Sequence, residues 1–190
     1  MESEHRVVSS EAEELILVDA EDNEAGFLSK AECHNGGGIL HRAFSLFLFN
    51  RRGELLLQQR SASKRLWPGF WSNSCCSHPR RGESMAVATQ RRLLDELNIE
   101  TSLEFVYKFS YQAEFGDSGS ENEFCHVFFG EIGDSVVPND HEIDGIRFVR
   151  PRDLAEEFTA TPAIFTPWLK MEWQTLLDEH RDKLATYSSI

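Results

Sequence analysis

Two glutamates, Glu121 and Glu123, begin a segment that is otherwise largely apolar, from Phe124 to Phe129. Side chains alternate along a β-strand, so these two carboxylates would share one face. Like charges on one face repel each other unless a cation or a proton lies between them. The pattern therefore indicates a cation site at the start of a strand. A solvated turn with ordinary surface acids is the alternative interpretation.

Three histidines could complete such a site. His34 and His41 lie on either side of a glycine triplet, and His78 lies two residues after Cys76 and three after Cys75. A lone histidine is more often a satisfied structural residue, so the metal hypothesis depends on several ligands converging. Three imidazoles and two carboxylates would form a five- or six-coordinate site for Mn²⁺, Mg²⁺ or Zn²⁺. Such a set differs from the four thiolates of a structural zinc site. We interpret the glycine triplet as a hinge between the histidines, because it lacks the spacing of a phosphate-binding loop.

Cations cluster at two places in the chain. Arg60 and Lys64 follow an apolar segment, and Arg92 stands four residues before Glu96 in a segment without Gly or Pro. A bound diphosphate would need such groups. The alternatives are a solvated loop for the first pair and, for the second, a surface salt bridge worth about 0.3 to 0.5 kcal/mol.

The charge balance argues against some partners. The chain has 190 residues, with 19 Lys and Arg against 32 Asp and Glu, and a formal net charge of −13. This charge repels nucleic acid and anionic lipid unless a basic patch overrides it, so we expect no nucleic-acid partner and no membrane partner. An anionic substrate must then meet a local cluster of cations.

Length and cysteine usage predict one domain over residues 1–190, with residues 1–12 disordered. The cysteines form no C-x-x-C pair and no framework typical of a secreted miniprotein, which indicates reduced thiols. The acidic start of the chain and the lack of an apolar run of membrane-spanning length predict a cytoplasmic protein.

The elements that would position the candidate residues follow from the hydrophobic pattern and the turn residues. A hairpin of two buried strands around Gly53 is expected to form the middle of the sheet. We therefore expect an α/β fold, a mixed sheet covered by helices. The expected strands are 15–18, 43–49, 54–59, 105–111, 124–129 and 146–149, and the expected helices are 85–97, a short one from Pro151 and a longer one over 165–187.

One helix and the loop before it carry a known motif in altered form. The segment Ser77-x5-Glu83-x7-Arg91-Arg92-Leu93-Leu94-Asp95-Glu96-Leu97-Asn98-Ile99 is similar to a Nudix box, whose acids hold Mg²⁺ on a diphosphate. Ser77 and Asn98 stand where glycines are usual, and Arg92 replaces an acid. The lost acid favours a relative that binds a diphosphate without cleaving it.

Further motifs flank this box. They are His34-x6-His41, Arg60-x3-Lys64, Trp67-Pro68-Gly69, Ser72-Asn73-Ser74-Cys75-Cys76-Ser77-His78-Pro79, Glu121-Asn122-Glu123, and Thr161-Pro162 through Pro167-Trp168. From about Leu15 to Trp173, the set resembles the type 1 isopentenyl diphosphate isomerases. The resemblance implies a Nudix-like mixed sheet sandwiched by helices, with N- and C-terminal additions.

The resemblance also implies roles for individual residues. It implies a first divalent metal, Mn²⁺, Mg²⁺ or Zn²⁺, held by His34, His41, His78, Glu121 and Glu123, and a Mg²⁺ held against the diphosphate by Glu96. The phosphates would contact Lys30, Arg60, Lys64 and Arg92. The catalytic groups would be Cys76 and Glu123, with Tyr111 as a hydrogen-bond partner and Trp168 as the aromatic wall.

The implied reaction is the reversible interconversion of isopentenyl and dimethylallyl diphosphate in isoprenoid biosynthesis, with metal and without flavin. Moving an unactivated double bond requires proton addition and removal through a tertiary carbocation. An aromatic face stabilises such a cation by about 2 kcal/mol or more when desolvated, and Trp67, Phe70 and Trp71 would close the pocket.

Two other functions are compatible with the sequence. A Nudix hydrolase of a nucleotide diphosphate would use Glu83, Asp95 and Glu96, and a diphosphate-binding regulator would keep the pocket without turnover. For the isomerase, we expect a small-molecule prenyl diphosphate as the partner and a monomer or weak dimer.

Overall fold

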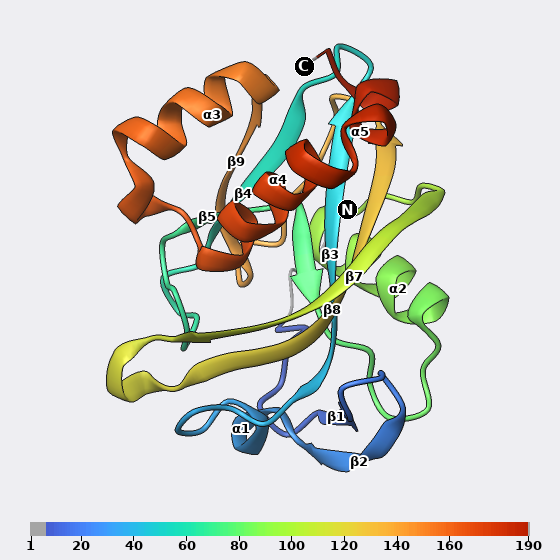
Figure 1. Ribbon diagram of the computed structural model, residues 1–190. Helices are drawn as coiled ribbons and strands as arrows, with labels where there is room; N and C mark the ends of the chain where they lie inside the picture. Colours follow the sequence, from blue (N-terminus) through green and yellow to red (C-terminus); the bar gives the residue numbers. More distant parts are fainter. Residues whose placement is uncertain (1–6, 190) are drawn as a thin grey trace, which may run out of the picture.

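Two central strands organise the fold (Figure 1). In the computed structural model, which describes residues 7–189, β3 (His41–Asn50) pairs in parallel with β8 (Ser120–Ile132) over their shared length. On its other pairings, β3 runs antiparallel to β1 (Glu14–Val18), β4 (Leu55–Arg60) and β6 (Cys75–Ser77). The predicted β3–β4 hairpin is therefore confirmed as the centre of a mixed sheet.

The remaining strands extend this sheet at its edges. The strand β7 (Leu103–Glu114) pairs with β8. Both β9 (Ile143–Val149) and the short β5 (Trp71–Ser72) pair with β4. The sequence analysis missed β2 (Glu24–Ser29), which pairs with β1. The short β5 and β6 were also missed, because two or three residues are too few to show an alternating pattern.

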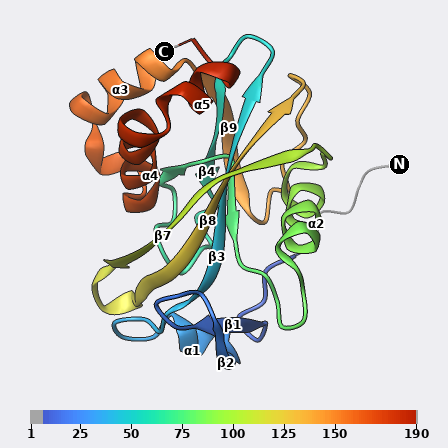
Figure 2. The ribbon, with the colours of Figure 1, turned by 45° about the vertical axis from the view of Figure 1, so that its right-hand side comes forward.

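Helices cover both faces of the sheet, as expected (Figure 2). On one face lies α2 (Met85–Leu97), and on the other lie α3 (Pro151–Ala160), α4 (Pro167–Glu179) and α5 (Arg181–Tyr187). Alternate residues of β3 serve the two layers: Phe44 packs on the α2 side and Phe47 on the α4 side. Within residues 7–189, no helix combines the length and the apolar character needed to cross a membrane.

The bounds of α2 match the prediction, and local chemistry explains them. The Ser84 side chain accepts a hydrogen bond from the backbone N–H of Val87, which caps the start of the helix. Asn98 ends it in the left-handed conformation with φ 53°, a position that asparagine tolerates better than most residues. The predicted terminal helix over 165–187 was wrong in two respects, since α4 begins at Pro167 and His180 separates α4 from α5.

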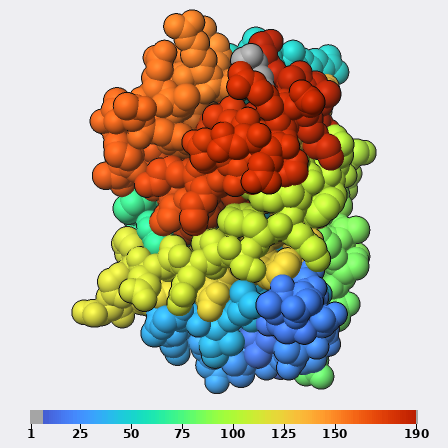
Figure 3. Space-filling view, viewed as in Figure 1, coloured from blue at the N-terminus to red at the C-terminus, as the bar shows by residue number. Residues whose placement is uncertain are grey.

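The N-terminal elements, which include the short α1 (Lys30–Cys33), gather at one end of the molecule, opposite the C-terminal helices (Figure 3). Two short 3-10 helices, at Gly116–Ser118 and Pro162–Ile164, complete the elements. The predicted disorder over 1–12 is wrong for residues 7–12, because Val8 is buried and its carbonyl accepts a hydrogen bond from Arg92 at 3.0 Å. Residues 1–6 lie outside the described part of the chain.

Candidate active site

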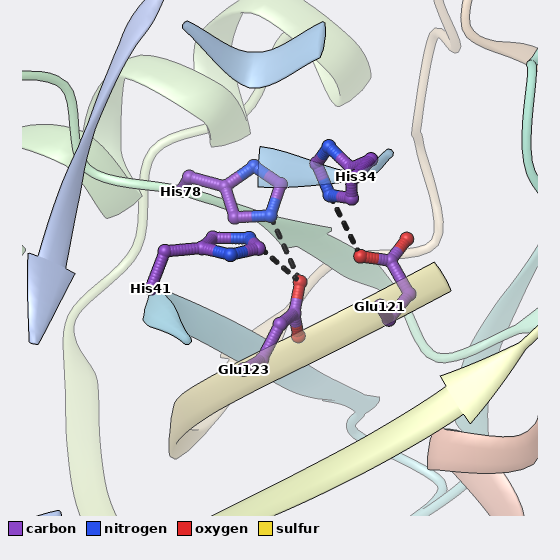
Figure 4. Close-up of side chains that lie close together, drawn as sticks. All are labelled: His34, His41, His78, Glu121 and Glu123. Atoms are coloured by element: carbon purple, nitrogen blue, oxygen red, sulfur yellow. Dashed lines mark hydrogen bonds and ion pairs between the residues drawn. The ribbon is translucent and has the colours of Figure 1, made fainter. Parts of the chain in front are cut away.

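Strand pairing places the predicted metal ligands together (Figure 4). His41 on β3 lies directly opposite Glu123 on β8 in the parallel ladder. Glu121 lies two residues before Glu123 and so points to the same face. His34 follows α1, and His78 follows β6, which pairs with β3. Four separate segments of the chain therefore deliver these five side chains to one end of the sheet.

The five side chains form a compact cluster. One ligand atom from each lies within 4.8 Å of the others. His34 Nε2 is 2.8 Å from Glu121 Oε2, and His78 Nε2 is 2.8 Å from Glu123 Oε1. His41 Nε2 is 3.9 Å from the same Glu123 oxygen. All five are buried except His78, whose side chain is 11% exposed.

Backbone contacts orient two of the imidazoles. The Nδ1 atoms of His34 and His41 lie 2.8 and 2.7 Å from the carbonyl oxygens of Lys30 and Ile39. A carbonyl accepts only, so Nδ1 carries a proton in both rings and Nε2 faces the cluster, with a free lone pair whenever the ring is neutral.

Buried polar atoms of the cluster that form no hydrogen bond indicate whether the cluster fits a metal. Among the described residues, His34 Nε2, His41 Nε2 and Glu121 Oε2 are buried and form no well-aligned hydrogen bond, although His34 Nε2 and Glu121 Oε2 lie 2.8 Å apart. Native proteins rarely leave such atoms unsatisfied. Three imidazole nitrogens and two carboxylates are ligands that a divalent cation accepts. The residues present therefore fit a divalent metal.

The pKa values of the two glutamates shift in opposite directions. Although burial opposes it, the contact with His34 lowers the pKa of Glu121 to about 2. Burial and the charge of Glu121 raise the pKa of Glu123 well above its usual range. Burial also lowers the pKa of His41 to about 4, with a further contribution from His34. The same patch of sheet thus holds one ionised carboxylate and one that tends to keep its proton.

A cavity of about 440 Å³ opens beside this cluster. Cys76, Glu123, Tyr111 and Trp168 all line it. The Tyr111 hydroxyl donates to Glu123 Oε2 at 2.7 Å. Burial raises the pKa of Cys76 to about 12, so its sulfur carries a proton at neutral pH.

The predicted cations line the same cavity. They are Lys30, Arg60, Lys64 and Arg92. Burial and the neighbouring Lys64 lower the pKa of Lys30, which is the signature of cations crowded together. The Arg60 guanidinium lies 5.2 Å from the centroid of a Trp168 ring, and one of its nitrogens lies 3.8 Å from Cys76 Sγ. The cavity is therefore suited to an anion attached to a short apolar group.

Glu142 is a carboxylate of this cavity that sequence reasoning missed. It is 2% exposed and forms ion pairs with Lys64 and, at 3.4 Å, with Arg92. Although burial opposes it, these cations lower its pKa to about 2. The residue follows Asn139-Asp140-His141, a segment with the composition of an ordinary turn, so nothing in the sequence marked it.

The structure rules out the alternative of a surface salt bridge on α2. Arg92 and Glu96 do pair, but their side chains are only 2% and 3% exposed. Glu96 is absent from the cavity lining and from the five-residue cluster, and its Oε1 also contacts Cys75 Sγ at 3.5 Å. Cys75 is fully buried and lies on the opposite side of β6 from Cys76, so it packs in the core and does not face the cavity.

The expectation that Trp67, Phe70 and Trp71 close the pocket is wrong. None of the three lines the cavity, and all pack against the main core. Trp67 instead lies edge-on to Trp168, with ring centroids 5.1 Å apart and an angle of 88° between the planes. It supports the cavity wall from behind, because aromatic rings favour this arrangement.

Comparison with known proteins identifies the fold. A model of the NUDIX domain matches residues 39–169. A solved structure from Deinococcus radiodurans superposes with a TM-score of 0.69 over 84% of this chain and 96% of that one, at 23% identity. A MutT protein from Methanosarcina mazei has a TM-score of 0.61 over 75% of this chain and 95% of that one, at 17% identity. The predicted Nudix-like α/β fold is confirmed.

Sequence relatives identify the family within that fold. The chain is 42% identical to isopentenyl-diphosphate Delta-isomerase 1 of Photorhabdus laumondii, over 91% of this chain and 99% of that protein. It is 44% identical to isopentenyl-diphosphate Delta-isomerase of Serratia proteamaculans, over 82% of this chain and 87% of that protein. The chain therefore belongs to the type 1 isopentenyl diphosphate isomerases of the Nudix superfamily.

Proposed function

We propose that this chain interconverts isopentenyl diphosphate and dimethylallyl diphosphate by adding and removing protons. The enzyme is an isopentenyl-diphosphate Delta-isomerase, and its relatives carry the name of this activity. The observation that supports this most is the shared cavity, which Cys76, Glu123 and a group of cations all line. The proposed domain comprises residues 1–190.

The proposed proton transfers use Cys76 and Glu123. One of the pair adds a proton to the terminal methylene of the substrate, which leaves the positive charge on the tertiary carbon. The other removes a proton from the carbon next to the diphosphate-bearing methylene, and the double bond forms there. At each step one of the pair carries the proton and the other is deprotonated, and the raised pKa of Cys76 lets its thiol hold that proton between turnovers. Tyr111, through its bond to Glu123 Oε2, would hold that carboxyl in place.

Trp168 and the cations would stabilise charge of opposite sign. Trp168 would present its ring to the tertiary carbocation, worth about 2 kcal/mol when desolvated. Lys30, Arg60, Lys64 and Arg92 would bind the diphosphate oxygens. A divalent metal on the five-residue cluster, Mn²⁺, Mg²⁺ or Zn²⁺, would lower the proton affinity of Glu123 and hold it in place. The Mg²⁺ that the resemblance assigns to Glu96 would require the Arg92–Glu96 ion pair to open, since Glu96 does not line the cavity. No flavin would be required.

The remaining parts of the proposal concern the setting of the enzyme. A prenyl diphosphate is the partner that the cavity suits. The acidic surface, with a net charge of −13, supports a protein that binds neither nucleic acid nor membrane. We propose a cytoplasmic enzyme that is a monomer or a weak dimer.

The competing hydrolase would need free acids on the Nudix helix. Glu83 is instead paired with Arg91, with a 2.8 Å contact, and Glu96 is paired with Arg92. These ion pairs favour binding of a diphosphate over its cleavage. Release of nucleoside monophosphate from nucleotide diphosphates would support the hydrolase.

Deuterium exchange tests the proposal directly. Metal-loaded protein incubated with isopentenyl diphosphate in deuterated water is expected to form dimethylallyl diphosphate and to take up deuterium. Cys76→Ala and Glu123→Gln should each lose at least about 100-fold in rate. Cys75→Ala, which removes the adjacent thiol that points away from the cavity, is the matched control. Neither interconversion nor deuterium uptake by the wild type would refute the proposed activity.

A further inference from the structure

Three consecutive polar residues are fully buried: Ser72 at the end of β5, and Asn73 and Ser74 in the link to β6. Burying a polar group costs free energy unless it is hydrogen-bonded. The proposed mechanism uses none of these residues, yet they directly precede the strand that carries Cys76. Their hydrogen bonds therefore show what the segment holds in place.

The Asn73 side chain uses its whole hydrogen-bonding capacity. Its Oδ1 accepts from Ser72 Oγ at 2.9 Å and from Trp168 Nε1 at 3.2 Å. Its Nδ2 donates to the carbonyl oxygens of Cys75 at 2.9 Å and Leu46 at 3.3 Å. An amide offers two acceptor sites and two donor hydrogens, so all four are occupied. This pattern also determines which way the amide points, since the two carbonyls can only accept.

One end of this amide restrains the aromatic wall. The indole N–H of Trp168 is shared between Asn73 Oδ1 and Ser72 Oγ, the latter at 2.9 Å. Ser72 in turn lies 3.1 Å from the Thr166 hydroxyl at the start of α4. Together with the edge-on packing of Trp67, these bonds prevent the indole from rotating about its side-chain bonds.

The other end of the amide restrains the strand that carries Cys76. The carbonyl of Cys75, which accepts from Asn73, belongs to the peptide unit that links Cys75 to Cys76. Leu46, the second carbonyl partner, lies on β3 and pairs with Cys75 in the sheet. The amide thus joins α4, β3 and β6, the three elements whose relative position determines how Trp168 faces Cys76.

We infer that Asn73 is a positioning residue, which fixes the indole of Trp168 relative to the Cys76 strand so that the carbocation forms against the ring face. The inference rests on the proposed isomerase function. Misplacement of reacting groups by about 1 Å can reduce a rate about 100-fold without loss of binding. Loss of the amide is therefore expected to lower kcat and to leave KM almost unchanged, because the cations that bind the diphosphate do not contact Asn73.

Ser74 offers a matched control for this role. It is as buried as Asn73 and lies next to it, and its hydroxyl donates to the Leu56 carbonyl at 2.7 Å and accepts from the Leu48 N–H at 2.8 Å. These bonds join β3 to β4 and reach no group of the proposed site. Ser74→Ala removes buried hydrogen bonds from the same segment without touching Trp168 or the Cys76 strand.

The experiment compares Asn73→Ala with Ser74→Ala, each alone and combined with Trp168→Phe. Asn73→Ala should lower kcat about 10- to 100-fold with KM changed less than about threefold, and Ser74→Ala should change kcat by less than about threefold. Phenylalanine keeps an aromatic face but lacks the N–H, so in the Trp168→Phe background the effect of Asn73→Ala should shrink to about a third or less of its value. Urea unfolding of each variant separates these effects from loss of folded protein.

Several outcomes would overturn the inference. It fails if Asn73→Ala lowers kcat no more than Ser74→Ala, or lowers it equally with and without the indole N–H. If Asn73→Ala does not fold, Ser72→Ala, which removes the other acceptor of that N–H, serves the same comparison. A wild-type protein without isomerase activity would instead refute the proposed function, which keeps the two failures distinct.

Discussion

Arg92 and Glu96 form an ion pair inside the protein, four residues apart on α2. Arg92 also reaches Glu142 and the backbone carbonyl of Val8. Although burial opposes it, these two carboxylates raise the pKa of Arg92, so the guanidinium stays charged where it is removed from water. The altered residue of the Nudix box is therefore a structural centre that links α2, the loop before β9 and the N-terminal segment.

Removing this arginine should strongly destabilise the protein. Arg92→Ala leaves Glu96 and Glu142 buried without their cation, and breaking such a pair typically costs about 3 to 5 kcal/mol. Urea unfolding would measure the free energy of unfolding. Arg152→Ala removes an arginine with the same four-residue spacing to Glu156, in a pair whose side chains are 87% and 69% exposed. This control should lose less than about 0.5 kcal/mol. Equal losses for the two variants would contradict the prediction.

Metal binding should depend on the five-residue cluster. His34→Ala removes one buried ligand, so the purified variant should hold much less divalent metal than the wild type, as measured by elemental analysis. Chelation of the wild type should abolish isomerisation and lower Tm, because a ligand that binds only the folded state stabilises it.

A second histidine provides the control for this prediction. His126 Nε2 lies 2.9 Å from Asp22 Oδ2 and is 16% exposed, a similar carboxylate contact outside the cluster. His126→Ala should keep the metal content of the wild type. Full metal content in His34→Ala would argue against the assigned site.

Glu142 is expected to compete with the substrate for its cations. Glu142→Gln removes a negative charge next to Lys64 and Arg92 but keeps the shape of the side chain. Inorganic diphosphate should therefore bind about three- to tenfold more tightly, as measured by calorimetric titration. Asp144→Asn, a charge removal two residues away on β9 and outside the cavity lining, should leave the affinity unchanged. Weaker binding by Glu142→Gln would show that the carboxylate mainly orients the cations.

Glu172 should make stability depend on pH. Burial raises its pKa from 4.5 to about 8, although contacts with Ser45 and Cys125 oppose the shift. Between those pH values the folded protein keeps a proton that the unfolded chain has released, so the free energy of unfolding should fall as pH rises. Glu172→Gln should remove the part of this slope that Glu172 contributes and be more stable by up to about 4 kcal/mol at pH 8.

The control for this pH dependence lies on the same helix. Glu179 is exposed near the end of α4, so Glu179→Gln should keep the slope of the wild type. Thermal unfolding at pH 5 and pH 8 would compare the three proteins. The same pH dependence of the free energy of unfolding in the wild type and in Glu172→Gln would refute the assignment.

Sequence reasoning succeeded where the signal is local. The bounds of α2 depend on Ser84 and Asn98, which act on neighbouring backbone groups, and so could be read from the chain. The residues of the candidate site were brought to one cavity or cluster as expected, with the exception of Glu96, because fixed motif spacings carried them.

Features that depend on distant partners could not be predicted in this way. Glu142 is a cavity residue only because Lys64 and Arg92 reach it from other elements. The positioning role inferred for Asn73 depends on its hydrogen bond with Trp168, which lies 95 positions away in the sequence. The apolar character of Trp67 predicted a buried ring but not which side of Trp168 it would occupy, since hydrophobicity carries no direction.

The parallel register of β3 and β8, with His41 opposite Glu123, has a consequence for folding. A slip of one residue between these strands would turn both glutamates to the other face of the sheet and destroy the metal cluster. Residues 51–119 separate the two strands along the chain. Pairing between such distant segments forms slowly. Metal uptake during refolding should thus report the moment at which the strands align correctly, and bound metal should disfavour every misaligned sheet.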